Sequence, residues 1–140
     1  MNYLRSFKLF ENVNIPTDEE LVKITQEVEN ILNDLKGFIP YTVKSVDFQT
    51  YTYKKSKKLL TPTEVLPQIN IRIGGGAGEE EYKIKIDDYI QELYRIDQYL
   101  ESEGFILSTL NYLHSDLDLA IKALSGREII GITLYYKLKN

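Results

Sequence analysis

Residues 67–100 read PQINIRIGGGAGEEEYKIKIDDYIQELYRIDQYL, and the hydrophobic period changes twice within this stretch. Isoleucines alternate with polar residues before the glycine-rich segment 74–78, and the alternation resumes in residues 82–86. Two alternating runs around a glycine-rich turn predict a β-hairpin. Asp88 and Gln91 have the spacing of a helix cap, and apolar residues beyond them recur at helical spacing until Gly104. This pattern predicts a helix that is capped at Asp88 and packs on the hairpin.

Two further helices are predicted from their caps and apolar stripes. Thr17 and Glu20 have the spacing of a capping box and precede apolar residues at steps of three and four, which predicts a helix over residues 17–35. A second, short helix is predicted over residues 115–124, with Ser115 as its cap.

The remaining segments are predicted from their β-favouring composition. Residues 41–53 are rich in Tyr, Val and Thr, and a change of phase within them indicates a bulge or two shorter strands. The lysine-rich residues 54–67 are predicted to form an exposed loop, and residues 105–113 and 130–138 two more strands. These elements predict an α+β fold with two layers, in which two long helices and one short helix pack on one face of a mainly antiparallel sheet.

Length and composition set broad limits on the class of protein. A chain of 140 residues predicts a single domain over residues 15–140, preceded by an N-terminal arm over residues 1–14. The net charge of −4 argues against a protein that coats nucleic acid or anionic lipid along its whole surface. The absence of cysteine excludes disulfides and thiolate chemistry. We see no apolar signal segment and no membrane span, so we expect a protein that is not secreted and not inserted in a membrane.

No constellation of nucleophile, base and oxyanion donors is visible in the sequence, so we expect no enzyme, no cofactor and no metal site. The glycine segment precedes a predicted strand and three glutamates, which does not fit a phosphate-binding loop. The single histidine, His114, is followed by Asp116, and a small hydrolase that uses this pair is the weakest of three functional hypotheses.

The first hypothesis is a non-enzymatic protein–protein interaction. Its predicted surface combines the aromatic N-terminal arm with three tyrosines of the predicted strands, namely Tyr3, Phe7, Phe10, Tyr51, Tyr53 and Tyr135. Aromatic side chains so close to a terminus are costly to leave in water, so they should pack on the core or on a partner. A homodimer is plausible as well, because the last strand is expected to lie at a sheet edge that needs covering.

The alternative hypothesis is a module that binds single-stranded nucleic acid. Its residues lie within segment 51–58, where Tyr51 and Tyr53 would stack on bases and four lysines would track phosphates, namely Lys54, Lys55, Lys57 and Lys58.

The opening residues 1–7, MNYLRSF, followed by Phe10-Glu11-Asn12, resemble the leader of small uncharacterised accessory proteins of tailed bacteriophages. The end of the central helix, residues 99–105, is similar to a pattern in the same set. This resemblance implies an accessory protein of phage or mobile-element origin, either a virion component or a host-directed binder. It therefore implies a phage or host protein as the partner, and the host cytoplasm or a virion as the location. It carries over no catalytic residues.

Overall fold

The computed structural model describes residues 15–35, 39–54, 59–75 and 83–139, and over residues 48–54 and 59–64 it describes the backbone alone. Its elements are, in chain order, α2 (Asp18–Leu32), β1 (Tyr41–Lys54), β2 (Leu59–Gly74), β3 (Ile84–Lys85), the 3₁₀ helix η2 (Ile86–Tyr89), α3 (Ile90–Ser102), β4 (Phe105–Leu110), α4 (Leu117–Leu124), β5 (Glu128–Ile129) and β6 (Gly131–Leu138). The predicted N-terminal arm, with Tyr3, Phe7 and Phe10, lies outside the described residues.

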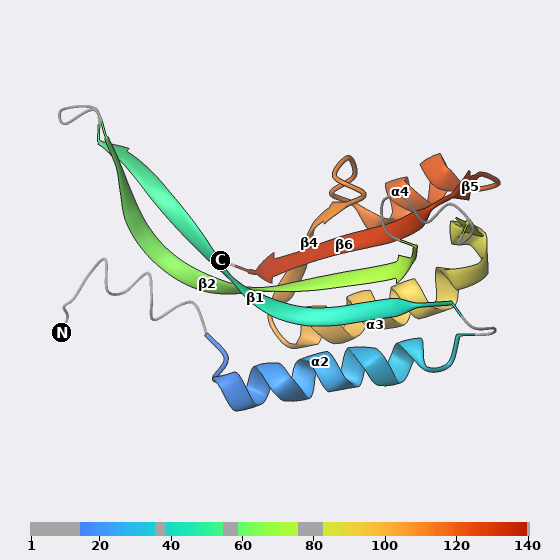
Figure 1. Ribbon diagram of the computed structural model, residues 1–140, viewed down its shortest axis with the longest axis horizontal. Helices are drawn as coiled ribbons and strands as arrows, with labels where there is room; N and C mark the ends of the chain where they lie inside the picture. The colour runs from blue at the N-terminus through green and yellow to red at the C-terminus, as the bar shows by residue number, and fades with distance from the viewer. Residues whose placement is uncertain (1–14, 36–38, 55–58, 76–82, 140) are drawn as a thin grey trace.

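Four strands form the main sheet in the order β1-β2-β6-β4, and all neighbouring strands are antiparallel. Figure 1 shows α2 and α3 side by side beneath this sheet, and the two helices are in contact. A second, two-stranded sheet joins β3 to β5. The predicted α+β class with a mainly antiparallel sheet is therefore confirmed.

The predicted pairing around the glycine segment is wrong. The isoleucines of β2 pair with β1 on one side and with β6 on the other, whereas Ile84 of β3 pairs with Ile129 of β5. A period of two identifies a strand but does not identify its partner, which contacts distant in sequence decide. Residues 76–82, which include the end of the predicted turn, lie outside the described residues.

The predicted loop over residues 54–67 is also wrong, because residues from Leu59 onward belong to β2. The lysines and prolines of this segment are typical of loops, but they are tolerated in strands that have no neighbour on one side. The last strand is likewise not at an edge, since β6 lies between β2 and β4. Its residue Thr133, on the face opposite the helices, is buried, as expected for a central strand.

The core lies between the sheet and the helices. Ile69, Ile71 and Ile73 of β2 stand opposite Tyr136, Leu134 and Ile132 of β6, and all six side chains are buried. Each helix adds its apolar stripe to this single core, namely Leu21, Ile24, Val28, Ile31 and Leu32 of α2, Leu93, Ile96 and Leu100 of α3, and Leu117 and Ala120 of α4. Full burial of each such aliphatic side chain contributes about 1.5–3 kcal/mol, so this layer supplies most of the driving force for folding.

The helix starts agree with the sequence in one case and differ in two. The capping box of α2 is confirmed, with Thr17 Oγ1 accepting from the Glu20 amide at 3.1 Å and Glu20 Oε1 accepting from the Thr17 amide at 2.8 Å. The central helix begins with the 3₁₀ turn η2 instead of a side-chain cap. The cap of α4 is Asp116 and not Ser115, because the Asp116 carboxylate accepts from the Leu119 amide at 2.9 Å.

Two glycines let β2 and β6 approach closely at the end of their ladder. Gly74 pairs with Gly131, and a Cβ built on Gly131 would lie 2.7 Å from the Gly75 carbonyl oxygen and 2.9 Å from that of Ile73. These contacts are with backbone atoms, which cannot rotate away as a flexible side chain can. The end of the ladder therefore requires glycine at position 131.

We expect Gly131→Ala to lower the free energy of unfolding by about 1–3 kcal/mol, because the added methyl group overpacks a backbone contact. Urea denaturation of both proteins measures this difference. Lys137→Ala is the control, since Lys137 lies in the same strand with an exposed side chain and should change stability by less than about 0.5 kcal/mol. An equal effect of the two substitutions would contradict the close approach.

Candidate functional site

The hairpin of β1 and β2 extends well beyond the rest of the sheet (Figure 1). β6 pairs with β2 only from Gln68 to Gly74, whereas β1 and β2 stay paired as far as Lys54 and Leu59. Residues 48–54 and 59–66 therefore form a two-stranded projection, which we call the ribbon. Within the described residues, neither of its strands pairs with any third strand.

The ribbon contains several residues that the sequence singles out. Tyr51 pairs with Pro62 and Tyr53 with Leu60. The register shifts between Thr50 and Tyr51, but the extra residue is Thr63 of β2, so the bulge does not lie in residues 41–53 as predicted. Lys54 is the last residue of β1. The other three predicted lysines (Lys55, Lys57 and Lys58) belong to the connection between the two strands and lie outside the described residues.

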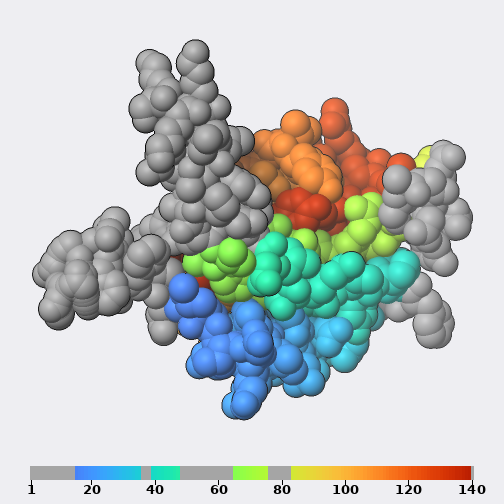
Figure 2. Space-filling view, turned by 60° about the vertical axis from the view of Figure 1, so that its left-hand side comes forward, coloured from blue at the N-terminus to red at the C-terminus, as the bar shows by residue number. Residues whose placement is uncertain are grey.

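The two strands of the ribbon differ as acceptors of a further strand. β2 contains Pro62 and Pro67, which have no amide hydrogen to donate, and its pairing with β6 begins at the very next residue, Gln68. β1 has no proline over its 14 residues and is the outer strand of the sheet. Figure 2 shows β1 at the surface, with α2 below it. The free edge of β1 is therefore the uninterrupted one.

A second surface is formed by the side of the sheet that faces away from the helices, which we call the open face. Its residues lie in three rows across β1, β2 and β6, namely Thr42, Arg72 and Thr133, then Lys44, Asn70 and Tyr135, then Val46, Gln68 and Lys137. The rows hold three cations and no carboxylate. The sequence analysis does not single out Lys44 or Arg72, because only the strand register brings them together.

A depression of about 250 Å³ lies on the open face, lined by Lys44, Arg72, Tyr112 and Tyr135 among others. The Arg72 guanidinium donates from Nε to the Gly75 carbonyl oxygen at 2.9 Å, from Nη2 to the same oxygen, and from Nη1 to the Thr133 hydroxyl. No carboxylate of the described residues forms an ion pair with it. The half-buried guanidinium thus keeps its charge without a described counter-ion.

Tyr112 reaches the depression from a strained turn that follows β4. Asn111 and Tyr112 have φ angles of 52° and 64°, in the left-handed region that residues other than glycine rarely adopt. The Asn111 side chain fixes this turn by accepting from the Thr133 amide at 2.7 Å and donating to the Gly131 carbonyl at 3.2 Å. The turn therefore places a tyrosine that is 66% exposed at the rim of the depression.

Tyr135 is half-buried and bonded to Tyr112. The two hydroxyl oxygens lie 2.7 Å apart, and the rings meet edge to face with centroids 5.4 Å apart. This hydrogen bond, together with burial, raises the pKa of Tyr135. Of the predicted binding tyrosines, only Tyr135 has a described side chain. Tyr112, which was not predicted, is more exposed than Tyr135.

Charge is distributed unevenly between the two layers. Acidic side chains gather on the helices, namely Asp18, Glu19, Glu20, Glu27 and Glu29 of α2 and Glu92, Asp97 and Glu101 of α3. The only charged side chains in the three rows of the open face are cations. The chain as a whole is negatively charged, but the open face of the sheet is positively charged.

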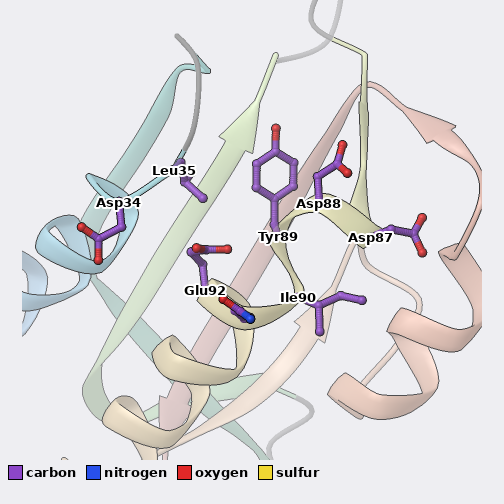
Figure 3. Close-up of a pocket in the computed structure, with 8 residues that line it drawn as sticks. Asp34, Leu35, Asp87, Asp88, Tyr89, Ile90 and Glu92 are labelled. Atoms are coloured by element: carbon purple, nitrogen blue, oxygen red, sulfur yellow. The ribbon is translucent and has the colours of Figure 1, made fainter.

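A second depression, of about 630 Å³, is acidic and lies between the end of α2 and η2. Figure 3 shows its carboxylates spread around the opening, with Asp34 on one side and Asp87 pointing away on the other. Asp34 pairs with Arg95 at 2.8 Å, and Asp87 accepts from the Ser125 hydroxyl and from the Gly126 amide at 2.7 Å. These two bonds lower the pKa of Asp87. Structural roles therefore account for Asp34 and Asp87.

The described contacts of His114 and Asp116 are structural. The Asp116 carboxylate caps α4, and the His114 backbone closes the turn after β4 through its bridge with Leu110. No described hydrogen bond joins the two side chains. No group of three or more histidine, aspartate or glutamate side chains in the described segments is placed to hold a metal ion. No described helix is long and apolar enough to span a membrane.

One titratable pair is buried between a helix and the sheet. The Tyr136 hydroxyl, on a fully buried side chain, donates to Asp97 Oδ1 at 2.8 Å. Burial raises the pKa of Asp97, and this hydrogen bond opposes the rise by stabilising the carboxylate. The carboxylates of Glu101, Asp118 and Asp116 also act on Asp97 and raise its pKa further. Because the hydrogen bond joins α3 to β6, we interpret the pair as structural.

Comparisons of the sequence with models of protein families and with curated proteins, and of the fold with solved structures, found no match.

We expect Tyr136→Phe to destabilise the protein more at pH 7 than at pH 4. The pKa of Asp97 is higher in the folded protein than in the unfolded chain. The contribution of this group to stability is therefore fully present below the pKa of the unfolded state, and it is lost as the pH rises through the pKa of the folded state. Removing the donor raises that pKa further, so the loss grows with pH, to about 1.5 kcal/mol at neutral pH for a half-buried carboxylate. Chemical denaturation at several pH values measures it.

Tyr41→Phe is the matched control for this pH series. The Tyr41 hydroxyl donates to the Asn33 side-chain oxygen, a partner that does not titrate, so its loss should cost the same at both pH values. A loss for Tyr136→Phe that does not change with pH would contradict the role given to Asp97.

Proposed function

We propose that this protein is a non-enzymatic binding protein that engages a protein partner through its ribbon. The observation that carries this proposal is that β1 and β2 continue to pair beyond the end of β6. A two-stranded hairpin is only marginally stable in water without a third strand or a covering layer. We therefore infer that a ribbon of this length packs against the surface of a partner protein.

The free edge of β1 offers the means of attachment. An exposed strand edge presents unpaired amide and carbonyl groups, to which an extended segment of another polypeptide can add as a further strand. β1 offers this edge without a proline, whereas β2 is interrupted twice. The proposed partner thus contributes an extended strand. The resemblance of the leader to phage accessory proteins supports a partner from a virion or a host cell.

The first test shortens the ribbon without touching the core. Residues 50–64 are replaced by Asn-Gly, which closes the hairpin between the paired residues Gln49 and Val65 with a two-residue turn. In pull-downs from host and infected lysates, we expect the full chain to retain a partner identified by mass spectrometry, and the shortened chain to lose it. Sedimentation measures self-association of both proteins.

The control keeps the ribbon and reverses the charge of the four predicted lysines. That variant should still retain a partner that binds by strand addition, because main-chain hydrogen bonds do not depend on side-chain charge. Recovery of the same partner by the shortened chain, with a circular dichroism spectrum that shows it is folded, would contradict the proposal.

A second candidate function is the binding of single-stranded nucleic acid, favoured by the projection of the ribbon, which carries the predicted residues at its end, away from the rest of the sheet. Tyr51, Tyr53 and Lys54 lie in the ribbon, and Lys55, Lys57 and Lys58 follow in sequence. Rings that stack on bases beside lysines that track phosphates are typical of such sites.

For this candidate, changing the four lysines to glutamate should abolish binding of an oligonucleotide, and binding by the natural chain should weaken steeply with salt. Fluorescence anisotropy with a labelled single strand measures both effects. Lys23→Glu, on α2, is the control and should have little effect. Binding that survives the fourfold substitution would end this candidate.

A further inference from the structure

We propose that the open face holds a site for a nucleoside phosphate, with the phosphate on Lys44 and Arg72 and the base on Tyr112. These residues line one depression of about 250 Å³, and they come from β1, β2 and the turn after β4. The site lies on the body of the sheet and does not depend on the ribbon or on the partner proposed above.

The register of β1 and β2 places the two cations where they can hold one phosphate. Thr42 stands opposite Arg72 and Lys44 opposite Asn70, so Lys44 and Arg72 are diagonal neighbours on the same face. Diagonal positions in an antiparallel pair lie about 7–8 Å apart, within reach of long side chains. The Thr42 hydroxyl and the Asn70 amide line the same depression and add neutral donors.

Arg72 retains donors for a ligand. A guanidinium has five N–H groups, and three of them are committed to Gly75 and Thr133. Those bonds fix the plane of the group, so the remaining N–H groups on Nη1 and Nη2 are held in place before a ligand arrives. Arginine binds phosphate oxygens through two parallel N–H bonds, which gives directional recognition.

The charge of the depression selects an anion. Arg72 is half-buried and has no ion pair with a described carboxylate, and the rows of the open face contain none. A partly desolvated cation without a counter-ion is unfavourable, and a bound anion removes that cost. The acidic side chains of the helices lie on the other layer of the molecule.

The aromatic part of the site selects a flat ring beside the anion. Tyr112 is 66% exposed, and its neighbour Leu113 is 82% exposed at the same turn. Left-handed residues other than glycine are unfavourable and persist where the surrounding structure enforces them. Here the Asn111 side chain and the Tyr112–Tyr135 hydrogen bond enforce them. The exposed Tyr112 ring is thus held in place, as stacking on a base requires.

A nucleoside phosphate can reach this site as a free nucleotide or as one unit of a single strand. Isothermal titration calorimetry with adenosine monophosphate, adenosine, inorganic phosphate and a ten-residue deoxyadenosine oligonucleotide separates the parts and the sources. We expect the nucleotide to bind more tightly than adenosine or phosphate alone. Equal affinity for nucleotide and oligonucleotide identifies the free nucleotide as the source, and tighter binding of the oligonucleotide identifies the strand.

Two variants test the residues. Lys44→Glu should weaken nucleotide binding at least tenfold, and Tyr112→Leu should weaken it about 5- to 100-fold by removing the stacking ring. Lys122→Glu, on the exposed side of α4, and the fourfold lysine variant of the ribbon should bind as the natural chain does. Both Lys44 and Tyr112 are exposed, so circular dichroism should show folded variants.

The proposal is overturned if neither the nucleotide nor the oligonucleotide shows binding at ligand concentrations up to about 10 mM. It is also overturned if either Lys44→Glu or Tyr112→Leu leaves nucleotide affinity unchanged. A loss of oligonucleotide binding only in the fourfold ribbon variant, with Lys44→Glu unaffected, would favour the ribbon and reject the open face.

Discussion

The ladder between β2 and β6 is the constraint on which the other elements depend. It aligns Ile69, Ile71 and Ile73 with Tyr136, Leu134 and Ile132, and this double row is the surface against which the helices pack. A slip of one residue would turn every one of these side chains to the opposite face. The same alignment places Arg72 beside Thr133 on the open face, so the core and the candidate site share one register.

The helices and the strand identities were largely readable from the sequence, because each depends on neighbours along the chain. The capping box at Thr17 is such a local feature, and the structure has it. Strand partners depend on residues far apart in the sequence, and the predicted partners are wrong. The isoleucines of β2 were predicted to pair with the segment that forms β3, and β6 was predicted at an edge although it lies at the centre of the sheet.

The candidate sites show the same division. Tyr51 and Tyr53 were singled out by composition, but their place in a projecting ribbon follows from the length of β6, which stops pairing at Gln68. Lys44 and Arg72 lie 28 positions apart and become neighbours only through the register of β1 and β2. Tyr112 gains its position from a left-handed turn that no simple pattern of residues announces. The one signal for this site in the sequence is the alternation of polar residues along a predicted strand, which indicates a polar face.

The ribbon is independent of the core in a way that affects how this protein can change. Its strands pair only with each other in the described structure, so adding or removing one cross-strand pair would leave the registers of β2, β6 and β4 intact. Each added pair would lengthen the projection by about 3.4 Å. The length of the hairpin can therefore change in small steps during evolution, while the folded body that carries it stays the same.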